Sequence, residues 1–542
     1  MRKSSYSLAL IPVVLLSCHS KVEKEETKKL NIIHIMTDDH SYQTISAYGH
    51  PLSKVAPTPN LDRLASKSML FQQAFVENSL STPSRACLMT GLYSHQNGQR
   101  RLGAGIDTTK TFVSEILQEN GYQTAVVGKW HMQCEPKGFD YYSILWDQGN
   151  YYNPDFKRKD TQDKYVREEG YATHLITDYA IDFLENRDLN KPFCLYVHHK
   201  APHRNWKPEE KYLTLYDDVV FPYPETFDDD YATRKAAQKQ EMQIDRDMTL
   251  IYDLKMDNLL SDSQYDKEWN REGMTQLLDR MNPKQLEAWN KAYAHRKKDF
   301  SEKNPSGEDL KKWKYQEYIK DYLRCIKTVD DEVGRLLDYL ERSGLMENTI
   351  IVYTSDQGFY MGEHGWFDKR FMYEESFRTP LIIYHPTLTK GDKTSLLVQN
   401  LDFAPTFLAI ANVEKPKEMS GTSLLPLLDG TTPKEWRDDL YYHYYDYPAI
   451  HYVNRHDGVR TERYKLIHFY KNTDEKDQIN ENELFDLAND PHELNNLYGK
   501  VGFEEITTDK DGTFDLITSN IPFGNMVVYD RAYAKGKDKV KE

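Results

Sequence analysis

The chain has 542 residues, more than one hydrophobic core usually organises, so we expect two domains of unequal size. Its 70 Lys and Arg residues against 85 Asp and Glu residues give a net charge of −15, and no long basic run is interleaved with aromatic residues. The composition therefore argues against nucleic acid as a partner. An anionic substrate must be attracted by local cations, against the field of the whole chain.

The N-terminus begins with basic residues, continues with an apolar run over residues 8–16 and reaches Cys18 directly afterwards. That run is too short to span a bilayer. The pattern resembles a bacterial lipoprotein signal over residues 1–18, in which Cys18 becomes the acylated first residue and the charged residues 19–29 form a tether. It implies a protein in the periplasm or at the cell surface, attached to the outer membrane through lipid only. The alternative is a cleaved secretory peptide with an incidental cysteine.

Short apolar and β-branched runs, bounded by turn residues, predict strands that are buried on both faces. They occupy residues 31–36, 124–127, 193–197, 350–353 and 381–384. Segments of helical periodicity lie between them, including residues 60–71, which Asn60 can cap, and residues 318–342, which Gly344 terminates. This alternation predicts an α/β fold in which a large, mostly parallel sheet carries helices on both faces.

Changes in composition predict the domain organisation. Residues 222–305 are highly charged, favour helix and lack buried-strand runs, which indicates a helical insertion in a catalytic domain of residues 30–430. Two further strands are expected at residues 440–445 and 464–469, within a smaller C-terminal α+β domain of residues 431–542.

Two pairs of oxygen-bearing side chains follow predicted strands. Asp38 and Asp39 come after the first strand, and Asp356 and Gln357 come after the fourth. The carboxyl ends of parallel strands are where such sheets bind ligands. Adjacent carboxylates repel unless a cation or donors neutralise them, and hard oxygen ligands favour Ca²⁺ or Mg²⁺ over zinc. These pairs predict one divalent cation, with direct ligation by Gln357 left open; the alternative for Asp38 and Asp39 alone is a solvated turn.

The most specific motif is the stretch Ser81-Thr82-Pro83-Ser84-Arg85, followed by Met89-Thr90-Gly91. It resembles the sequence around the modified nucleophile of type I sulfatases, members of the alkaline-phosphatase-like superfamily. The block at residues 356–370, continued by Arg378-Thr379-Pro380-Leu381, resembles a second sulfatase signature. A turn that leads into a helix capped by Ser84 is the alternative for the first stretch taken alone.

The resemblance to type I sulfatases implies a role for each of the following side chains. Ser81 would be oxidised by a separate maturation enzyme to formylglycine (3-oxoalanine), whose hydrated aldehyde attacks sulfur and later releases sulfate. Ca²⁺ would be bound by Asp38, Asp39, Ser81, Asp356 and Gln357. Sulfate oxygens would be held by Arg85, Lys129 and Lys369. His203 or Lys369 would protonate the leaving oxygen, and His131 would take a proton from the remaining hydroxyl of the hydrated aldehyde.

The substrate is suggested by three further segments. Residues 200–206, residues 228–248 and Asp368-Lys369-Arg370 together resemble bacterial N-acetylglucosamine-6-sulfatases that act on host glycans such as glycosaminoglycans and mucins. Contacts to the sugar ring are expected from Asp368, Arg370, His456 and Arg460, although Asp368 and Arg370 can instead pair with each other. The alternatives are a sulfatase for another glycan position, a phosphodiesterase or phosphatase of the same superfamily, and an inactive lipoprotein that binds sulfated glycans.

Overall fold

A computed structural model describes residues 29–260, 268–471 and 479–500 of the chain. The expected lipoprotein signal and Cys18 lie outside these residues. None of the described helices combines the length and the apolar character that crossing a membrane requires.

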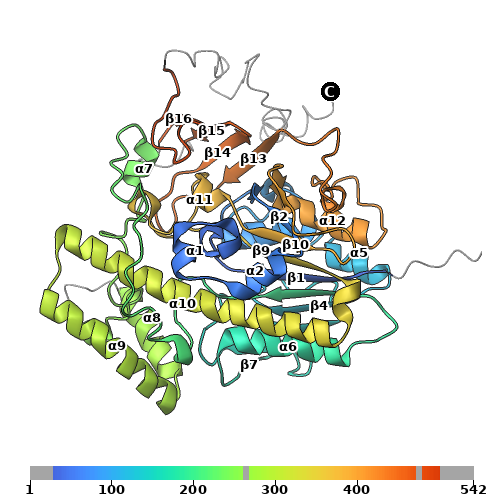
Figure 1. The fold of residues 1–542 in the computed structure, drawn as a ribbon, viewed down its shortest axis with the longest axis horizontal. Helices are drawn as coiled ribbons and strands as arrows, with labels where there is room; N and C mark the ends of the chain where they lie inside the picture. Colours follow the sequence, from blue (N-terminus) through green and yellow to red (C-terminus); the bar gives the residue numbers. More distant parts are fainter. Residues whose placement is uncertain (1–28, 261–267, 472–478, 501–542) are drawn as a thin grey trace, which may run out of the picture.

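A ten-stranded sheet forms the centre of the larger part of the molecule (Figure 1). Its five middle strands are mutually parallel and run in the order β9 (Thr349–Ser355), β1 (Asn31–Thr37), β8 (Phe193–His198), β4 (Gln123–Gly128) and β5 (Tyr141–Leu145). Antiparallel pairings extend it on both sides. The outer strands are β10 (Leu381–Tyr384), β2 (Met69–Phe71) and β11 (Lys393–Thr394) on one side, and β6 (Asp155–Arg158) and β7 (Tyr165–Arg167) on the other. The predicted α/β fold class is confirmed, with a sheet that is mixed at its edges.

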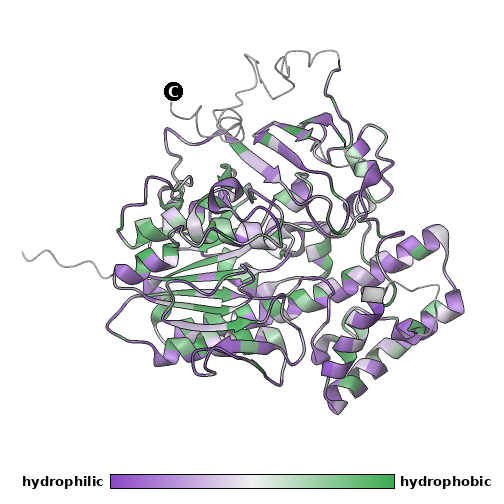
Figure 2. Cartoon of the chain, turned by 180° about the vertical axis from the view of Figure 1, so that it is seen from behind, coloured by the Kyte–Doolittle hydropathy of each residue, from purple (hydrophilic) through white to green (hydrophobic). Residues whose placement is uncertain are grey.

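Alternate residues of β1 show why its sequence is mostly apolar. Ile33 and Ile35 belong to the core on one face, which is covered by α2 (Pro59–Ala65), α6 (Ala172–Asn186) and α10 (Gly307–Arg342). Ile32 and Met36 belong to the core on the other face, under α3 (Ser81–Thr90), α5 (Val113–Glu119) and α12 (Phe403–Ile410). A strand covered on both sides is apolar at most positions, and the polar exception at the centre of β1, His34, is buried beside His198. Figure 2 shows the resulting apolar strands between more polar outer layers.

The helix expected at residues 60–71 is wrong in its second half. The helix α2 starts one residue earlier than expected, with Pro59 in its first turn, and ends at Ala65. Met69–Phe71 instead forms β2, which pairs antiparallel with β10. All three apolar residues of the Met-Leu-Phe triplet are buried in the sheet, and helical periodicity alone does not reveal this strand pairing. The other predicted helix is confirmed, but α10 begins at Gly307 rather than at residue 318.

The segment from residue 222 to residue 305 contains α7 (Lys235–Lys239), α8 (Glu268–Arg280) and α9 (Pro283–Lys303). Figure 1 shows α8 and α9 beside the first half of α10, projecting from the body of the molecule. A buried ion-pair cluster joins these parts, because Asp321 of α10 accepts from Arg296 Nη1 at 2.7 Å and lies 3.0 Å from Lys255 Nζ. The segment is therefore attached to α10, and through α10 to the ten-stranded sheet, by charge pairing as well as by apolar contact.

Four antiparallel strands form a second, smaller sheet near the C-terminus: β13 (Asp439–Tyr444), β14 (His456–Thr461), β15 (Tyr464–Phe469) and β16 (Glu481–Asp486). The runs at residues 440–445 and 464–469 predicted β13 and β15. The strands β14 and β16 carry charged and polar residues between their apolar ones, which hid them from a search for apolar runs. One face of this sheet packs against aromatic side chains from the segment that follows β9.

Candidate active site

The carboxyl ends of the parallel strands bring the candidate residues together. Asp38 and Asp39 follow β1, Asp356 and Gln357 follow the adjacent β9, and Lys129 follows β4. All five side chains are almost completely buried. The sequence-based placement of these motifs at one edge of the sheet is thus what the structure shows.

Ser81 is the first residue of α3, and the N-terminus of this helix lies at the buried carboxylates. The Ser81 hydroxyl donates to Asp38 Oδ1 at 3.0 Å. The backbone residue before it, Leu80, is extended and provides no side-chain cap. Ser84 does not cap the helix, since it lies within α3 and its hydroxyl accepts from Asn400 Nδ2 at 3.0 Å. The helix therefore presents Ser81 to the carboxylates from its N-terminal end.

Each of the three carboxylates is paired with a cation. Lys129 Nζ donates to Asp38, Lys369 Nζ donates to both oxygens of Asp39 at 2.6 and 2.7 Å, and Arg85 donates to Asp356 Oδ2 through Nε at 3.2 Å and Nη2 at 3.0 Å. A buried carboxylate needs such pairing to stay ionised. The pairs also place three positive groups beside Ser81, where an anionic substrate would need them.

The carboxylates remain under mutual repulsion despite these pairs. Burial raises the pKa of Asp39 to about 6, and burial together with the charge of Asp38 raises the pKa of Asp356 to about 7. Gln357 donates through Nε2 to Asp39, and its buried Oε1 has no partner among the described residues. Three carboxylates and an unpartnered amide oxygen are the donors that a hard divalent cation takes. The residues present therefore fit such an ion.

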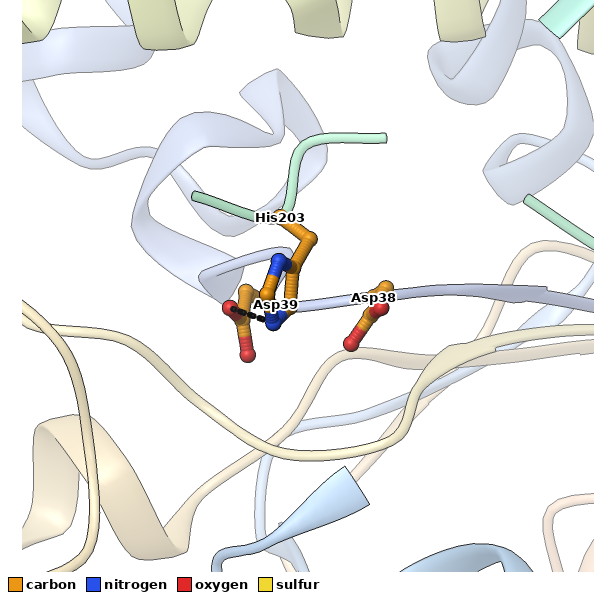
Figure 3. A group of neighbouring side chains, drawn as sticks. All are labelled: Asp38, Asp39 and His203. Carbon is orange, nitrogen blue, oxygen red and sulfur yellow. Dashed lines mark ion pairs between the residues drawn. The ribbon is translucent and has the colours of Figure 1, made fainter. Parts of the chain in front are cut away.

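His203 lies over the aspartates (Figure 3). Its Nε2 is 3.8 Å from Asp39 Oδ2, and Asp38, Asp39 and His203 each offer a ligand atom within 4.8 Å of the others. Burial lowers the pKa of His203 well below its ordinary value, so the imidazole is neutral. Its Nδ1 lies 2.5 Å from the backbone carbonyl of Arg204, which selects the tautomer with the proton on Nδ1.

His131 lies beside Thr82, the residue that follows Ser81. Its Nδ1 is 3.4 Å from Thr82 Oγ1, and its Nε2 is 3.7 Å from Asp147 Oδ1. Burial, assisted by the charge of Lys129, lowers the pKa of His131 far below its ordinary value. A neutral imidazole next to the nucleophile position has the protonation state that a general base requires.

Four residues of this group have left-handed backbone, a conformation that also occurs elsewhere in the described chain. Asp39, His131, Asp368 and Arg370 all have positive φ, between 50° and 106°. For residues other than glycine this conformation is sparsely populated, and it tends to persist where function requires it. The residues on either side of Lys369, whose side chain contacts Asp39, are two of these four.

The two expected sugar contacts Asp368 and Arg370 lie next to the site and pair with each other, Arg370 Nε donating to Asp368 Oδ1 at 3.1 Å. Two residues that sequence reasoning missed join them. His451 Nε2 is 3.3 Å from Asp368 Oδ2 and 3.2 Å from Arg204 Nη1, while Arg204 forms a two-point ion pair with Asp253. Arg204 lies inside a segment that had already been singled out, whereas no motif marks His451.

The structure does not bring His456 and Arg460 to this group. His456 is enclosed by the rings of Phe371, Tyr442 and Phe469, and its nitrogens lie at the backbone of Met372 and Asn454. Arg460 is held by Glu374 at 3.0 Å and by Gln73 at 2.8 Å. Both were expected to contact sugar. In the structure His456 is part of the aromatic core and Arg460 links the smaller sheet to Glu374 and Gln73, because β14 places both residues against the segment after β9.

Comparisons with known proteins agree with this geometry. A family model described as "Sulfatase" matches residues 30–413, and one described as "N-sulphoglucosamine sulphohydrolase, C-terminal" matches residues 362–515. An N-acetylglucosamine-6-O-sulfatase of Bacteroides thetaiotaomicron is 47% identical over 510 residues, which cover 92% of this chain and 88% of that protein. The N-acetylglucosamine-6-sulfatase of Homo sapiens is 25% identical, over 77% of this chain and 68% of that protein. A structure solved in complex with its substrate D-glucosamine-2-N,6-O-disulfate is 44% identical, with a TM-score of 0.84, and the match covers 95% of this chain and 100% of that one.

Proposed function

The chain belongs to the sulfatase family, and we propose that it removes the 6-O-sulfate of N-acetylglucosamine residues in host glycans. The family resemblance inferred from the motifs is confirmed, and the chain is a sulfuric ester hydrolase. The observation that carries the proposal is the meeting of Ser81 with three cation-paired carboxylates, in a chain 47% identical to an N-acetylglucosamine-6-O-sulfatase. The family implies formylglycine and a divalent metal; the residues that carry them are part of the proposal.

Ser81 is proposed to be oxidised by a maturation enzyme to formylglycine, which supplies a hydrated aldehyde as the nucleophile for sulfur. Asp38, Asp39 and Asp356 are proposed to hold one Ca²⁺, with Ser81 and Gln357 as further oxygen ligands. When bound, this ion supplies positive charge against the sulfate oxygens. The burial of the three carboxylates and the unpartnered Gln357 oxygen support the assignment.

The remaining polar side chains are assigned by their positions. Arg85, Lys129 and Lys369 hold the sulfate oxygens, an electrostatic clamp that is strongest in a buried site. Burial lowers the pKa of Lys369, but the charges of Asp39, Asp368 and Asp38 together outweigh it and raise that pKa, so that this ammonium keeps a proton to offer the leaving oxygen. His203, the other donor expected from the resemblance, lies on the same side beside Asp39, but it is neutral with its proton on Nδ1, so we assign the donated proton to Lys369. His131, which is neutral and lies beside Thr82, takes the proton that must leave before sulfate is expelled.

The proposed substrate is tested with a panel of monosaccharide sulfates and free sulfate as the readout. N-acetylglucosamine 6-sulfate is expected to be hydrolysed well above galactose 6-sulfate and N-acetylgalactosamine 4-sulfate, because polar groups built for one set of hydroxyls are left unpaired by another. A clear preference for either galacto-configured sugar would contradict the substrate while leaving the family assignment intact.

The metal assignment predicts that Asp356→Ala loses both the ion and activity, since it removes one of three carboxylates. Elemental analysis of the purified wild-type protein should give one calcium per chain, and the variant should retain less than a tenth of that amount. Asp160→Ala, which removes an exposed carboxylate paired with Arg158, is the control and should keep its calcium. Full calcium occupancy in Asp356→Ala would show that the ion is bound elsewhere.

Lipid attachment at Cys18, and with it a place at the outer membrane facing the periplasm or the cell surface, is the proposal that rests on sequence alone. In detergent phase separation the wild-type protein from its bacterial host should enter the detergent phase, because an acyl chain adds free energy of transfer with each buried methylene. Cys18→Ala should stay in the aqueous phase. Equal aqueous behaviour of the two proteins would reject the anchor.

A further inference from the structure

The active-site side chains form a row along the carboxyl ends of five neighbouring parallel strands. The row begins at β9, which carries Asp356, and ends at β5, which is followed by Trp146, with β1, β8 and β4 between them. Neighbouring strands lie about 4.8 Å apart, so that four spacings separate β9 from β5 by about 19 Å. This is longer than a single sugar ring needs.

One end of the row is buried and closed by paired charges. Asp368, Arg370 and His451 are only 4%, 3% and 6% exposed. Asp368 lies between Arg370 Nε at 3.1 Å and His451 Nε2 at 3.3 Å, and Tyr444 accepts from Arg370 Nη1 at 3.3 Å. These contacts leave no open surface at this end for a further sugar.

The opposite end is exposed and remains connected to the catalytic groups. Gln148 Oε1 accepts from Lys129 Nζ at 2.5 Å, and Asp147 Oδ1 lies 3.7 Å from His131 Nε2 with 49% of the Asp147 side chain exposed. Trp146, next to Asp147, is 54% exposed. It is the only tryptophan among the exposed large hydrophobic residues of the described chain.

The backbone at Trp146 is fixed although its indole is not covered. Its N–H donates to the Asp155 carbonyl at 3.0 Å, and its own carbonyl accepts from the Gly149 N–H at 2.8 Å. Single exposed hydrophobic residues are common and need no explanation. A fixed tryptophan, one residue away from a side chain that reaches the catalytic His131, is different, because aromatic rings with a few polar groups are typical linings of ligand sites.

We propose that Trp146 is the stacking platform for the sugar joined to carbon 1 of the sulfated residue. The inference rests on the proposed function, which directs the 6-sulfate to Ser81 and carbons 3 and 4 of the ring toward Asp368 and Arg370. Carbon 1 lies across the ring from carbon 4, so its substituent leaves toward the exposed end of the row. The apolar C–H face of the sugar attached to carbon 1 packs on the indole of Trp146. The sulfated residue is then the non-reducing end of the glycan and lies at the closed end of the row, near Asp368 and Arg370.

The test compares two substrates in each variant: N-acetylglucosamine 6-sulfate, and a disaccharide that carries this residue at its non-reducing end. For Trp146→Ala we expect kcat/KM to fall about tenfold on the disaccharide, or about 1.4 kcal/mol, and less than threefold on the monosaccharide. Trp146→Phe should recover most of the loss, since it keeps an aromatic face. Leu189→Ala, which removes an exposed leucine just before β8, at the opposite edge of the sheet, should change neither value.

The possible outcomes separate the platform from the proposed function. Equal losses on both substrates, or no loss on the disaccharide, would overturn the platform while activity toward 6-sulfate remained. If the wild-type enzyme hydrolysed neither substrate but desulfated another sugar of the panel, the proposed function would fail first. Recovery of kcat/KM on the disaccharide in Trp146→Phe would show that the aromatic face is what the substrate needs. An unchanged melting temperature of Trp146→Ala would show that the loop at residues 146–149 has not collapsed.

Discussion

Replacing Ser81 by alanine is expected to abolish sulfate release and to leave the fold unchanged. The Ser81 hydroxyl donates to Asp38 Oδ1 at 3.0 Å and lies 3.5 Å from Gln357 Nε2, and both neighbours have other partners. Alanine is also the best helix former, at a position that begins α3. The variant loses the atom from which the aldehyde is made, so no other group of the site can replace it as nucleophile.

Three measurements on the purified proteins check this expectation. Sulfate release by Ser81→Ala should be at background. Its melting temperature should match that of the wild type. The wild-type peptide that contains Ser81 should have a mass two hydrogens below the value calculated with serine. Ser84→Ala is the matched control, because Ser84 lies in the same helix and its hydroxyl contacts Asn400. Turnover above background by Ser81→Ala would remove Ser81 from the mechanism.

The second large effect is expected for Lys129→Ala, which should lower kcat at least ~10²-fold, the range found when one stabilising group for a developing charge is lost. Lys129 Nζ donates to Asp38 and Gln148 and faces the Ser81 side of the site. Its removal leaves Asp38 buried without its lysine, so the melting temperature should fall as well. Asp38 then keeps the hydrogen bond from Ser81 and its charge interactions with Arg85 and Lys369.

Rates must therefore be measured well below the melting temperature of the variant. Lys137→Ala is the control, since Lys137 pairs with Glu115 at 2.9 Å on the surface and should leave kcat unchanged. A value of kcat for Lys129→Ala within threefold of the wild type would show that this ammonium does not contact the sulfate in the transition state.

The sequence predicted the positions of the catalytic groups because strand ends and motifs coincide. The apolar runs that became β1, β4, β8 and β9 are each followed within a few residues by charged or histidine side chains. Parallel neighbours place those ends at one edge, so adjacency in space follows from the fold class. The roles of these residues came from the family resemblance and could not have come from spacing.

Contacts between distant segments were beyond prediction. His451 reaches Asp368 from a loop of the small sheet, and no local pattern encodes that approach. His456 and Arg460 were expected at the substrate because they are polar, yet β14 places them against Phe371 and Glu374. The strand β2 was hidden for a related reason, since its pairing with β10 joins residues far apart in the chain. In each case tertiary contact overrides the local signal.

The segment that follows β9 supplies Lys369 to the active site and aromatic rings to the smaller sheet. Tyr442 of β13 donates to the Arg370 carbonyl at 2.5 Å, and Lys465 of β15 donates to the Met372 carbonyl at 2.7 Å. The small sheet thus supports the backbone next to Lys369, the proposed sulfate-binding lysine. We therefore expect that the larger sheet cannot be used without the smaller one: a cut that releases the small sheet would free the backbone around Lys369 and lower activity.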